Sequence, residues 1–542
     1  MSASGSEQRI SILEELRAAI PSQLPAYLAK QRWFGGKARQ IRSSELIDIV
    51  PFRQNDPEAF FLFVRVEYET GPGETYVLPM LCHPEPADWH DADPGIAFLT
   101  VRSSVRASPL ILTGALENHE VLAGLLQAIK ETSSFQGWQG EIRSTRTSEL
   151  QQLLPSSGNS LTPRLLKGEQ SNSSIVFGEN LILKIFRRVE AGMNPDLEIG
   201  LFLMQRAQFK NAPPVVGSLE YQAENKQSAT IGILQGFVPN QGDAWRFTLQ
   251  HLAAFWHDVS AGSIDHPRLS PLNAELDLRT TPTNLSIPSL ASYLDAVGLL
   301  AKRTAQMHQA LSSDSSDSAF AQEPYSAQFQ NSMESSIREL AERNLGLLRQ
   351  KRNGLPDEVR SQGEEVIAQE ATILERIHAT LRSPIGGTRI RIHGDYHLGQ
   401  VLYTGADFMI IDFEGEPARA LADRRMKRSP LQDVAGMLRS FHYAAFASWM
   451  APPPGTKRPE GTTDYLVSWA QAWAGWVSSR FLDSYLEQSG EAAYLPSGSG
   501  KLIDFLQLHI LEKAIYELGY ELNNRPAWVG IPLAGISALL NL

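Results

Sequence analysis

The chain has 542 residues, of which 42% are hydrophobic and 20% are charged, and this composition excludes global disorder. A formal net charge of −11 argues against non-specific binding to nucleic acid or anionic membranes, because both require a basic surface. Cys82 is the single cysteine, which rules out an intramolecular disulfide and favours a reducing compartment. Neither a basic leader with an apolar core nor an apolar run of membrane-spanning length is recognisable, so we expect a cytoplasmic protein that binds neither nucleic acid nor membrane.

Residues 1–110 are predicted to form an α+β subdomain. The amphipathic pattern of residues 12–24 indicates a helix that is interrupted at Pro21. Segment 31–37 (QRWFGGK) places two adjacent aromatic rings before two glycines, which favours a structural turn, and a phosphate contact through its basic residues is the alternative. Segments rich in β-branched and aromatic residues predict an antiparallel sheet over residues 46–50, 59–68 and 75–81.

Residues 111–240 are predicted to form a second subdomain that contains a β-hairpin. Residues 117–129 have the pattern of a helix, and segments 165–177 and 181–186 predict two strands joined by a polar turn. A run of hydroxyl and amide side chains precedes the apolar part of the first strand, and such a loop can offer polar groups to phosphates. An ordinary serine-rich turn is the alternative. The residues of this candidate phosphate loop are Ser171, Asn172, Ser173 and Ser174.

Lys184 lies in the middle of an otherwise apolar strand, where burying an unpaired ammonium would be costly. We therefore expect an anionic partner, which Glu198 in the following helix could supply on one side and nucleotide phosphates on the other. A lysine that reaches water from the strand edge is the alternative. Residues 229–238 predict a further strand, in which Gln235 is assigned to the nucleotide site, and residues 239–243 predict a hinge.

Residues 241–542 are mostly helical in pattern. Apolar spacing predicts helices over 290–311, 333–347 and 366–381, and His308 in the first of them is expected to be structural. The serine- and aspartate-rich segment 312–318 is expected to be a mobile surface loop.

Two neighbouring segments carry the chemistry. Residues 391–400 (RIHGDYHLGQ) follow the strand-like segment 388–392, and residues 408–416 (FMIIDFEGE) contain the second strand of a predicted hairpin with residues 401–403. Asp395 and Asp412 are expected to emerge near each other from adjacent strand ends. Asp395 could deprotonate an acceptor hydroxyl, while Asp412 and Gln400 could hold Mg²⁺ on nucleotide phosphates. This layout indicates phosphoryl transfer.

These motifs resemble the catalytic and metal loops of the aminoglycoside phosphotransferase-like kinases, and within them those of the maltokinases. Gln400 stands where the broad family more often has asparagine, and maltokinases share this glutamine. The resemblance covers most of the chain, and its further segments occur in the same order: Arg32–Lys37, Glu169–Ser174, Lys184–Arg188, Asn194–Glu198, Ser429–Arg439 and Tyr516–Pro526.

The resemblance implies a bilobal protein-kinase-like fold of the α+β class, with an N-terminal cap (1–110), an N-lobe (111–240) and a mainly helical C-lobe (241–542). It also implies ATP binding between the lobes and transfer of the γ-phosphate to the anomeric hydroxyl of maltose, with maltose 1-phosphate feeding α-glucan synthesis. An association with trehalose synthase, which supplies maltose and is fused to some maltokinases, is a further hypothesis.

A candidate sugar site follows from helical spacing. Lys513, Tyr516, Glu517 and Tyr520 share one helical face, where rings could stack on a sugar and charged groups could bind hydroxyls. The alternative is a pair of core tyrosines beside a Lys513–Glu517 ion pair. Glu414 and Glu416 lie just beyond the metal aspartate and either could reach the acceptor; Glu414 is the one assigned to it.

Three readings remain open at this level. The basic run 424–428 could be a solvated surface or could bind phosphate or sugar. The acceptor could be glucosamine, another hexose or an aminoglycoside rather than maltose. A third reading is an ATP-binding module without turnover, which the presence of Lys184, Asp395 and Asp412 disfavours.

Overall fold

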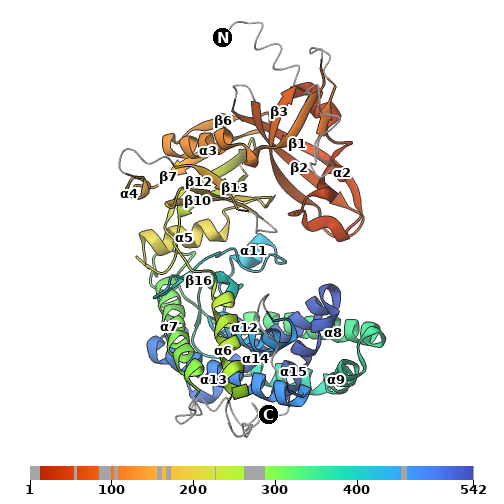
Figure 1. Cartoon of the computed structure of the whole chain (residues 1–542), viewed down its shortest axis with the longest axis vertical. Coiled ribbons are helices and arrows are strands. Elements are labelled where there is room, and N and C mark those ends of the chain that lie inside the picture. Colours follow the sequence, from red (N-terminus) through yellow and green to blue (C-terminus); the bar gives the residue numbers. More distant parts are fainter. Residues whose placement is uncertain are drawn as a thin grey trace. The chain divides into compact units, whose positions relative to one another are not determined.

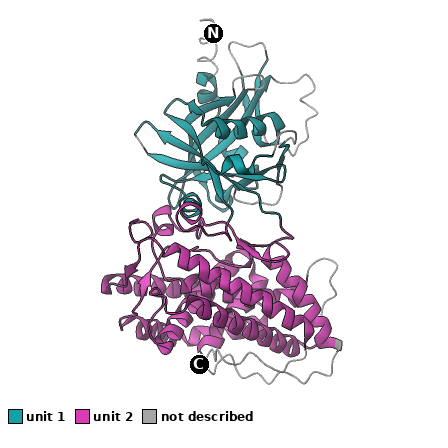
Figure 2. Cartoon of the chain, turned by 90° about the vertical axis from the view of Figure 1, so that its left-hand side faces the viewer, with its two compact units in different colours: residues 1–201, 213–239 teal, residues 202–212, 240–542 magenta. Residues whose placement is uncertain are grey.

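The chain divides into two compact units, which Figure 2 shows in different colours: residues 1–201 with 213–239, and residues 202–212 with 240–542. The computed structural model describes residues 13–53, 58–84, 99–102, 108–155, 161–166, 172–225, 227–261, 287–452 and 461–540. The division falls inside helix α5 (Pro195–Gln205), between Leu201 and Phe202.

The first sheet of unit 1 is antiparallel, as its sequence predicts (Figure 1). Its strands pair in the order β1-β2-β3-β5-β4, and β11 pairs with β3. The strand bounds are β1 Ile41–Arg53, β2 Glu58–Tyr68, β3 Glu74–Pro84, β4 Leu99–Val101, β5 Leu110–Gly114 and β11 Arg188–Val189.

Strand β2 is almost continuously apolar because both of its faces are buried. Successive side chains of a strand point to opposite faces. Phe60 and Leu62 join a core with Leu24 and Leu28 of α2 (Leu24–Lys30), whereas Phe61 joins a core shared with the second sheet. Both faces are therefore covered. The helix predicted over 12–24 breaks at Pro21 as expected, with residues 13–19 helical and α2 following.

The second sheet of unit 1 has the strand order β6-β7-β12-β13-β10-β9-β8. The predicted hairpin is confirmed, because β9 and β10 pair antiparallel from Leu181 opposite Phe177 to Phe186 opposite Asn172. The remaining bounds are β6 Ser134–Gln136, β7 Gly140–Arg146, β8 Pro163–Leu165, β9 Asn172–Phe177, β10 Leu181–Phe186, β12 Val215–Ala223, β13 Ser228–Gly236, α3 His119–Glu131 and α4 Leu150–Leu153.

Unit 2 is mainly helical, as predicted. The helix predicted over 290–311 is α7, and the one predicted over 333–347 lies within α8. The helices are α6 Ala244–Ala261, α7 Pro288–Leu311, α8 Ala327–Lys351, α9 Asp357–Ala368, α10 Glu370–Leu381, α11 Leu421–Arg424, α12 Leu431–Met450, α13 Thr463–Ser489, α14 Ser499–Asn524 and α15 Gly530–Leu540. None of the described helices is long and apolar enough to cross a membrane.

Two elements of unit 2 differ from the expectation. The helix predicted over 366–381 is split at Gln369, whose non-helical backbone separates α9 from α10. The strand predicted over 388–392 is reduced to β15 (Thr388–Arg389), because its partner β14 (Glu323–Pro324) is equally short. Beyond it Ile390 makes only an isolated bridge, to Arg428. The catalytic segment therefore continues from irregular backbone.

Helix α12 is the buried centre of unit 2 and packs against α6, α13 and α14. Most of its side chains are buried, including those of two charged residues, Asp433 and Arg439. Burying a charge is unfavourable unless it is paired and hydrogen-bonded. Both residues accordingly have specific partners, which organise the candidate site.

Candidate active site

The segment that carries Asp395 is irregular backbone fixed from below by a buried carboxylate. Asp433, in the first turn of α12, is only 2% exposed. Its Oδ2 accepts a hydrogen bond from the backbone N–H of His393 at 2.8 Å, and its Oδ1 accepts one from Gly394 at 2.9 Å. Two charge-assisted bonds to successive amides fix the loop immediately before Asp395.

His308 of α7 supports Asp433 from the other side. Its Nε2 lies 3.1 Å from Asp433 Oδ2, and its Nδ1 lies 2.9 Å from the hydroxyl of Tyr485. The ring is completely buried. The structural role expected for His308 is thus confirmed: the histidine orients Asp433, which holds the loop before Asp395.

The catalytic loop also contacts the loop that carries Asp412. The His393 ring donates from Nε2 to the carbonyl oxygen of Ile411 at 2.9 Å. Gly394 and Gly415 both have positive φ, at +83° and +73°, and a Cβ added to Gly394 would lie 3.3 Å from the Gly415 Cα. Glycine suits both needs, the left-handed backbone and the close approach. The two loops are therefore positioned as one structure.

The predicted hairpin after the catalytic loop is confirmed as β16 (Val401–Tyr403) and β17 (Phe408–Ile410). Asp412 follows β17, with a φ of +67°, a conformation that is rare for residues other than glycine. Its Oδ2 accepts a hydrogen bond from Gln400 Nε2 at 2.8 Å. Asp412 thus leaves a strand end, as expected, whereas Asp395 lies on the irregular loop rather than at an adjacent strand end.

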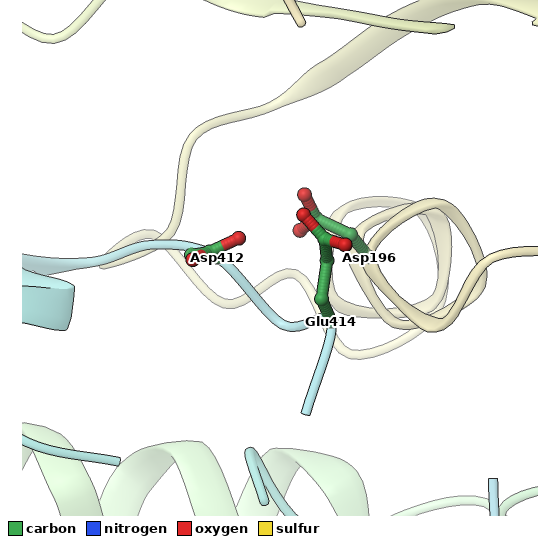
Figure 3. Close-up of side chains that lie close together, drawn as sticks. All are labelled: Asp196, Asp412 and Glu414. Atoms are coloured by element: carbon green, nitrogen blue, oxygen red, sulfur yellow. The ribbon is translucent and has the colours of Figure 1, made fainter. Parts of the chain in front are cut away.

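Glu414 lies beside Asp412, and one carboxylate oxygen of each is within 4.8 Å of the other. Figure 3 shows both side chains on the loop after β17, and it shows Asp196 on the first turn of α5. Carboxylate and amide oxygens are the ligands that Mg²⁺ prefers. Asp412, Gln400 and Glu414 therefore fit a hard divalent cation, whereas the sequence assigned Glu414 to the acceptor.

Asp395 itself faces α14. The Nζ atom of Lys513 lies 3.6 Å from Asp395 Oδ1 and 3.8 Å from Glu416 Oε2. The hydroxyl of Tyr516 donates to Glu416 Oε1 at 2.8 Å. Of the four side chains predicted on this helical face, Lys513 thus contacts Asp395 and Glu416, and Tyr516 contacts Glu416. We call Asp395, Glu416, Lys513 and Tyr516 the acceptor cluster.

Electrostatics within the acceptor cluster keep Lys513 charged. Burial lowers the pKa of Lys513, but the carboxylates of Asp395 and Glu416 raise it by more, so the net shift is upward. His397, whose Nε2 is 4.0 Å from Asp395 Oδ2, has a pKa lowered by burial and is neutral at pH 7. The cluster therefore holds two carboxylates and one ammonium.

The other two residues of the predicted face have different surroundings. Glu517 accepts from the buried guanidinium of Arg439, with Nη2 at 2.6 Å and Nε at 2.9 Å. Tyr520 is 47% exposed, and the guanidinium carbon of Arg525 lies 5.4 Å from its ring centroid. The alternative of a Lys513–Glu517 ion pair is thus replaced by Lys513 with Asp395 and Glu416, and Glu517 with Arg439.

In unit 1, Lys184 of β10 has an anionic partner, as its position in an apolar strand requires. Its Nζ lies 3.3 Å from Oδ2 of Asp196, whose side chain is 1% exposed. Asp196 lies in the first turn of α5, where its N–H donates a hydrogen bond to Asn194 Oδ1 at 2.8 Å. Glu198, the partner that the sequence assigned, is half-buried two residues further along the helix.

Three of the four residues of the predicted phosphate loop lie in a strand rather than in a loop, and their assignment to nucleotide phosphates stays a prediction. Asn172, Ser173 and Ser174 belong to β9, and Ser174 lies opposite Lys184 in the strand pairing. Ser173 is buried, and its hydroxyl accepts from Arg187 Nε at 3.0 Å. The hairpin extends through the polar run because β10 continues far enough to pair with it. Ser171 lies outside the described residues, and Gln235 is half-buried in β13, opposite Ile182.

The basic run 424–428 is largely part of the fold. Nη1 of Arg424 donates to the carbonyl oxygen of Glu414 at 3.1 Å, so it supports the metal-loop backbone. Nζ of Lys427 is buried and contacts Glu323 and the carbonyl oxygen of Ser318, both at 2.7 Å. The segment 312–318, expected to be a mobile loop, is thus held at its last residue, Ser318, by the side chain of Lys427.

Two residues that organise the site escaped the sequence assignments: Asp433 and Arg439. A signal existed for both. Asp433 and Arg439 are charged residues inside an otherwise apolar helix, which is the argument that singled out Lys184. The sequence alone did not decide whether Glu414 or Glu416 reaches the acceptor, because both lie on the same loop two residues apart.

Glu512 provides a prediction about acid stability. It lies 3.1 Å from His509 Nδ1 and 3.8 Å from Arg419, and although burial raises its pKa, these partners lower it to about 2. A depressed pKa stabilises the fold above the unfolded value of 4.5, and this contribution is lost as the pH falls toward 2. Glu512→Gln is expected to lower the free energy of unfolding at pH 7 by up to about 3 kcal/mol.

The measurement is urea unfolding of wild type and variant at pH 7 and at pH 3. The difference should be full at pH 7 and smaller at pH 3. The exposed Glu491→Gln serves as the matched control and should change little at either pH. If the difference in unfolding free energy between wild type and Glu512→Gln were as large at pH 3 as at pH 7, the lowered pKa of Glu512 would be contradicted.

Comparison with known families agrees with this geometry. A family model described as the maltokinase N-terminal cap domain matches residues 27–107, and one described as the phosphotransferase enzyme family matches residues 284–482. The fold is thus the bilobal fold of aminoglycoside phosphotransferases and protein kinases, with a β-rich cap and a helical C-lobe, and the predicted fold class is confirmed. The chain is a maltokinase-like protein of the aminoglycoside phosphotransferase superfamily.

Two curated relatives share 23% sequence identity with this chain. Glucosamine kinase of Streptacidiphilus jiangxiensis is 23% identical over 69% of this chain and 72% of its own, and that of Mycolicibacterium smegmatis is 23% identical over 69% and 78%. A solved glucosamine kinase in complex with glucosamine, ADP and inorganic phosphate superposes with a TM-score of 0.60 at 16% identity, covering 97% of this chain and 98% of that one. This likeness establishes the fold.

Proposed function

We propose that the chain is a maltokinase, which transfers the γ-phosphate of ATP to the anomeric hydroxyl of maltose and releases maltose 1-phosphate and ADP. The observation that carries this proposal is the acceptor cluster, where the ammonium of Lys513 lies between Asp395 and Glu416 and the hydroxyl of Tyr516 donates to Glu416. The maltokinase cap supports the sugar class.

In the proposed reaction, the carboxylate of Asp395 accepts a hydrogen bond from the 1-hydroxyl of the sugar and then takes its proton. The sugar oxygen forms a bond to the γ-phosphorus as the bond from that phosphorus to the β–γ bridging oxygen breaks, and ADP leaves. Glu416, rather than Glu414, is assigned to the sugar, because it is the carboxylate in contact with Lys513 and Tyr516.

Phosphate charge is balanced by other residues in this proposal. Lys184 is assigned to the nucleotide phosphates, and its salt bridge to Asp196 supplies the anionic partner that its position in the strand requires. Asp412 and Gln400, with Glu414 beside them, would hold Mg²⁺, which supplies positive charge to the phosphates when bound. Positioning and charge stabilisation, rather than a strong base, account for most of the expected rate.

A panel of acceptors tests this function. ADP release is measured with maltose, glucose, glucosamine and kanamycin, each with Mg²⁺ and after chelation followed by Mg²⁺ add-back. We expect turnover with maltose, a product phosphorylated at C1, and loss of activity to background on chelation with recovery on add-back. ADP release with none of the four acceptors would favour a non-catalytic ATP-binding module.

A second candidate is a glucosamine kinase, because the named relatives are glucosamine kinases. A preference for glucosamine over maltose in the same panel would favour it. The association with trehalose synthase also remains a proposal, to be tested by co-purification of the two proteins.

A further inference from the structure

The acceptor cluster already contains an ammonium group of its own. Lys513 lies 3.6 Å from one oxygen of Asp395 and 3.8 Å from one of Glu416, so a single cation is shared between the two carboxylates. The exposed fractions of these three side chains are 29%, 19% and 15%, which leaves them partly accessible and weakly screened.

The charge of the cluster is set by few groups. Tyr516 contributes a neutral hydroxyl to Glu416, and burial raises the pKa of that hydroxyl far above neutrality. His397 is neutral at pH 7, and Glu517 is matched by the guanidinium of Arg439. Lys513 is therefore the charge that balances Asp395 and Glu416.

We propose that Lys513 makes the acceptor site select sugars without an amine, because its ammonium occupies the carboxylate pair that would otherwise bind a substrate ammonium. An amine-bearing sugar would have to place its cation beside Lys513, and like charges a few ångströms apart repel. A neutral sugar meets no such repulsion and can accept a hydrogen bond from the lysine. This inference rests on the proposed function and names its specificity determinant.

The same geometry predicts what happens when the lysine charge is removed. Lys513→Met keeps the length of the side chain but leaves two carboxylates without their shared cation. A protonated amino sugar should then be attracted to the position that the lysine ammonium held. Adding Glu416→Gln to that variant removes one of the two carboxylates and should cancel most of the gain.

The test compares glucose with glucosamine, which differ only in a hydroxyl or an amine at C2, at a pH where the amine is protonated. We measure kcat/KM for both sugars by ADP release with wild type, Lys513→Met, Lys513→Arg and the double variant. The glucosamine-to-glucose ratio should rise on the order of tenfold to 100-fold in Lys513→Met and stay near wild type in Lys513→Arg. Lys501→Met, an exposed site on the same helix, is the matched control.

An unchanged ratio in Lys513→Met, or an equal rise in Lys513→Arg, would overturn the inference while leaving the proposed function intact. If the wild type phosphorylates no sugar, the proposed function fails, and calorimetric binding of glucosamine decides the inference separately. Tighter binding to folded Lys513→Met than to wild type supports it, and equal binding overturns it. Circular dichroism verifies folding, and Lys513→Gln replaces the methionine variant if that variant does not fold.

Discussion

Asp395→Asn is expected to lower kcat on the order of 10³-fold while leaving the fold and ATP affinity close to those of the wild type. Asparagine has nearly the same shape as aspartate, but it cannot take a proton from the sugar hydroxyl. The backbone of this loop is fixed by Asp433 through His393 and Gly394, not by the Asp395 side chain. Loss of activity should therefore not be accompanied by unfolding.

The measurements are steady-state ADP release, ATP binding by calorimetry and the thermal midpoint of unfolding. Asp464→Asn changes the same functional group at an exposed position in the first turn of α13 and should match the wild type in all three. Lys513 loses one of its two carboxylate partners in Asp395→Asn, so we also expect a change in sugar affinity. Turnover near the wild-type value would disprove the catalytic assignment of Asp395.

Asp433→Ala is expected to reduce both stability and activity, because this side chain never touches substrate but positions the loop that does. Its removal leaves the N–H groups of His393 and Gly394 and the buried ring of His308 without their carboxylate. Each unsatisfied buried group costs about 1–3 kcal/mol, so the free energy of unfolding should fall on the order of 4 kcal/mol.

Asp433→Asn separates the two effects. Its amide oxygen can still accept one backbone hydrogen bond, so it should remain folded and lose less stability than the alanine variant. A displaced catalytic loop should nevertheless reduce kcat on the order of 100-fold, since misplacement by about 1 Å is sufficient for this. Asp395→Asn should lower kcat without lowering the midpoint, whereas Asp433→Asn should lower both. Wild-type stability in Asp433→Ala would show that the loop is held by other contacts.

Local patterns were enough to predict most helices and strands. The apolar run of β2, the β9–β10 hairpin and the β16–β17 hairpin follow from strand periodicity and turn residues. The same local reading was wrong about residues 172–174, because a polar strand resembles a loop when its partner strand is not known. It was also wrong about residues 390–392, because a strand-like pattern pairs only where a partner is long enough.

Lys184 shows what the sequence could predict and what required the tertiary structure. Its apolar strand required an anionic partner, and that requirement is energetic and can be read from sequence. Where α5 begins relative to β10 decides which acids come near, and the structure places Asp196, in the first turn of that helix, 3.3 Å from Lys184 Nζ. Glu198, two residues later, stays a predicted partner.

By itself, the sequence determined the apolar strand that carries Lys184 and the hairpin that precedes Asp412, and it predicts a catalytic loop and a metal loop, because each is a local pattern with a local physical cause. Only the tertiary structure decided which charges meet. Lys513 reaches Asp395 and Glu416, and Asp433 reaches His393 and Gly394, through the packing of α12 and α14 beneath the loops. Contacts between residues distant in sequence depend on helix packing, and no spacing rule along the chain encodes them.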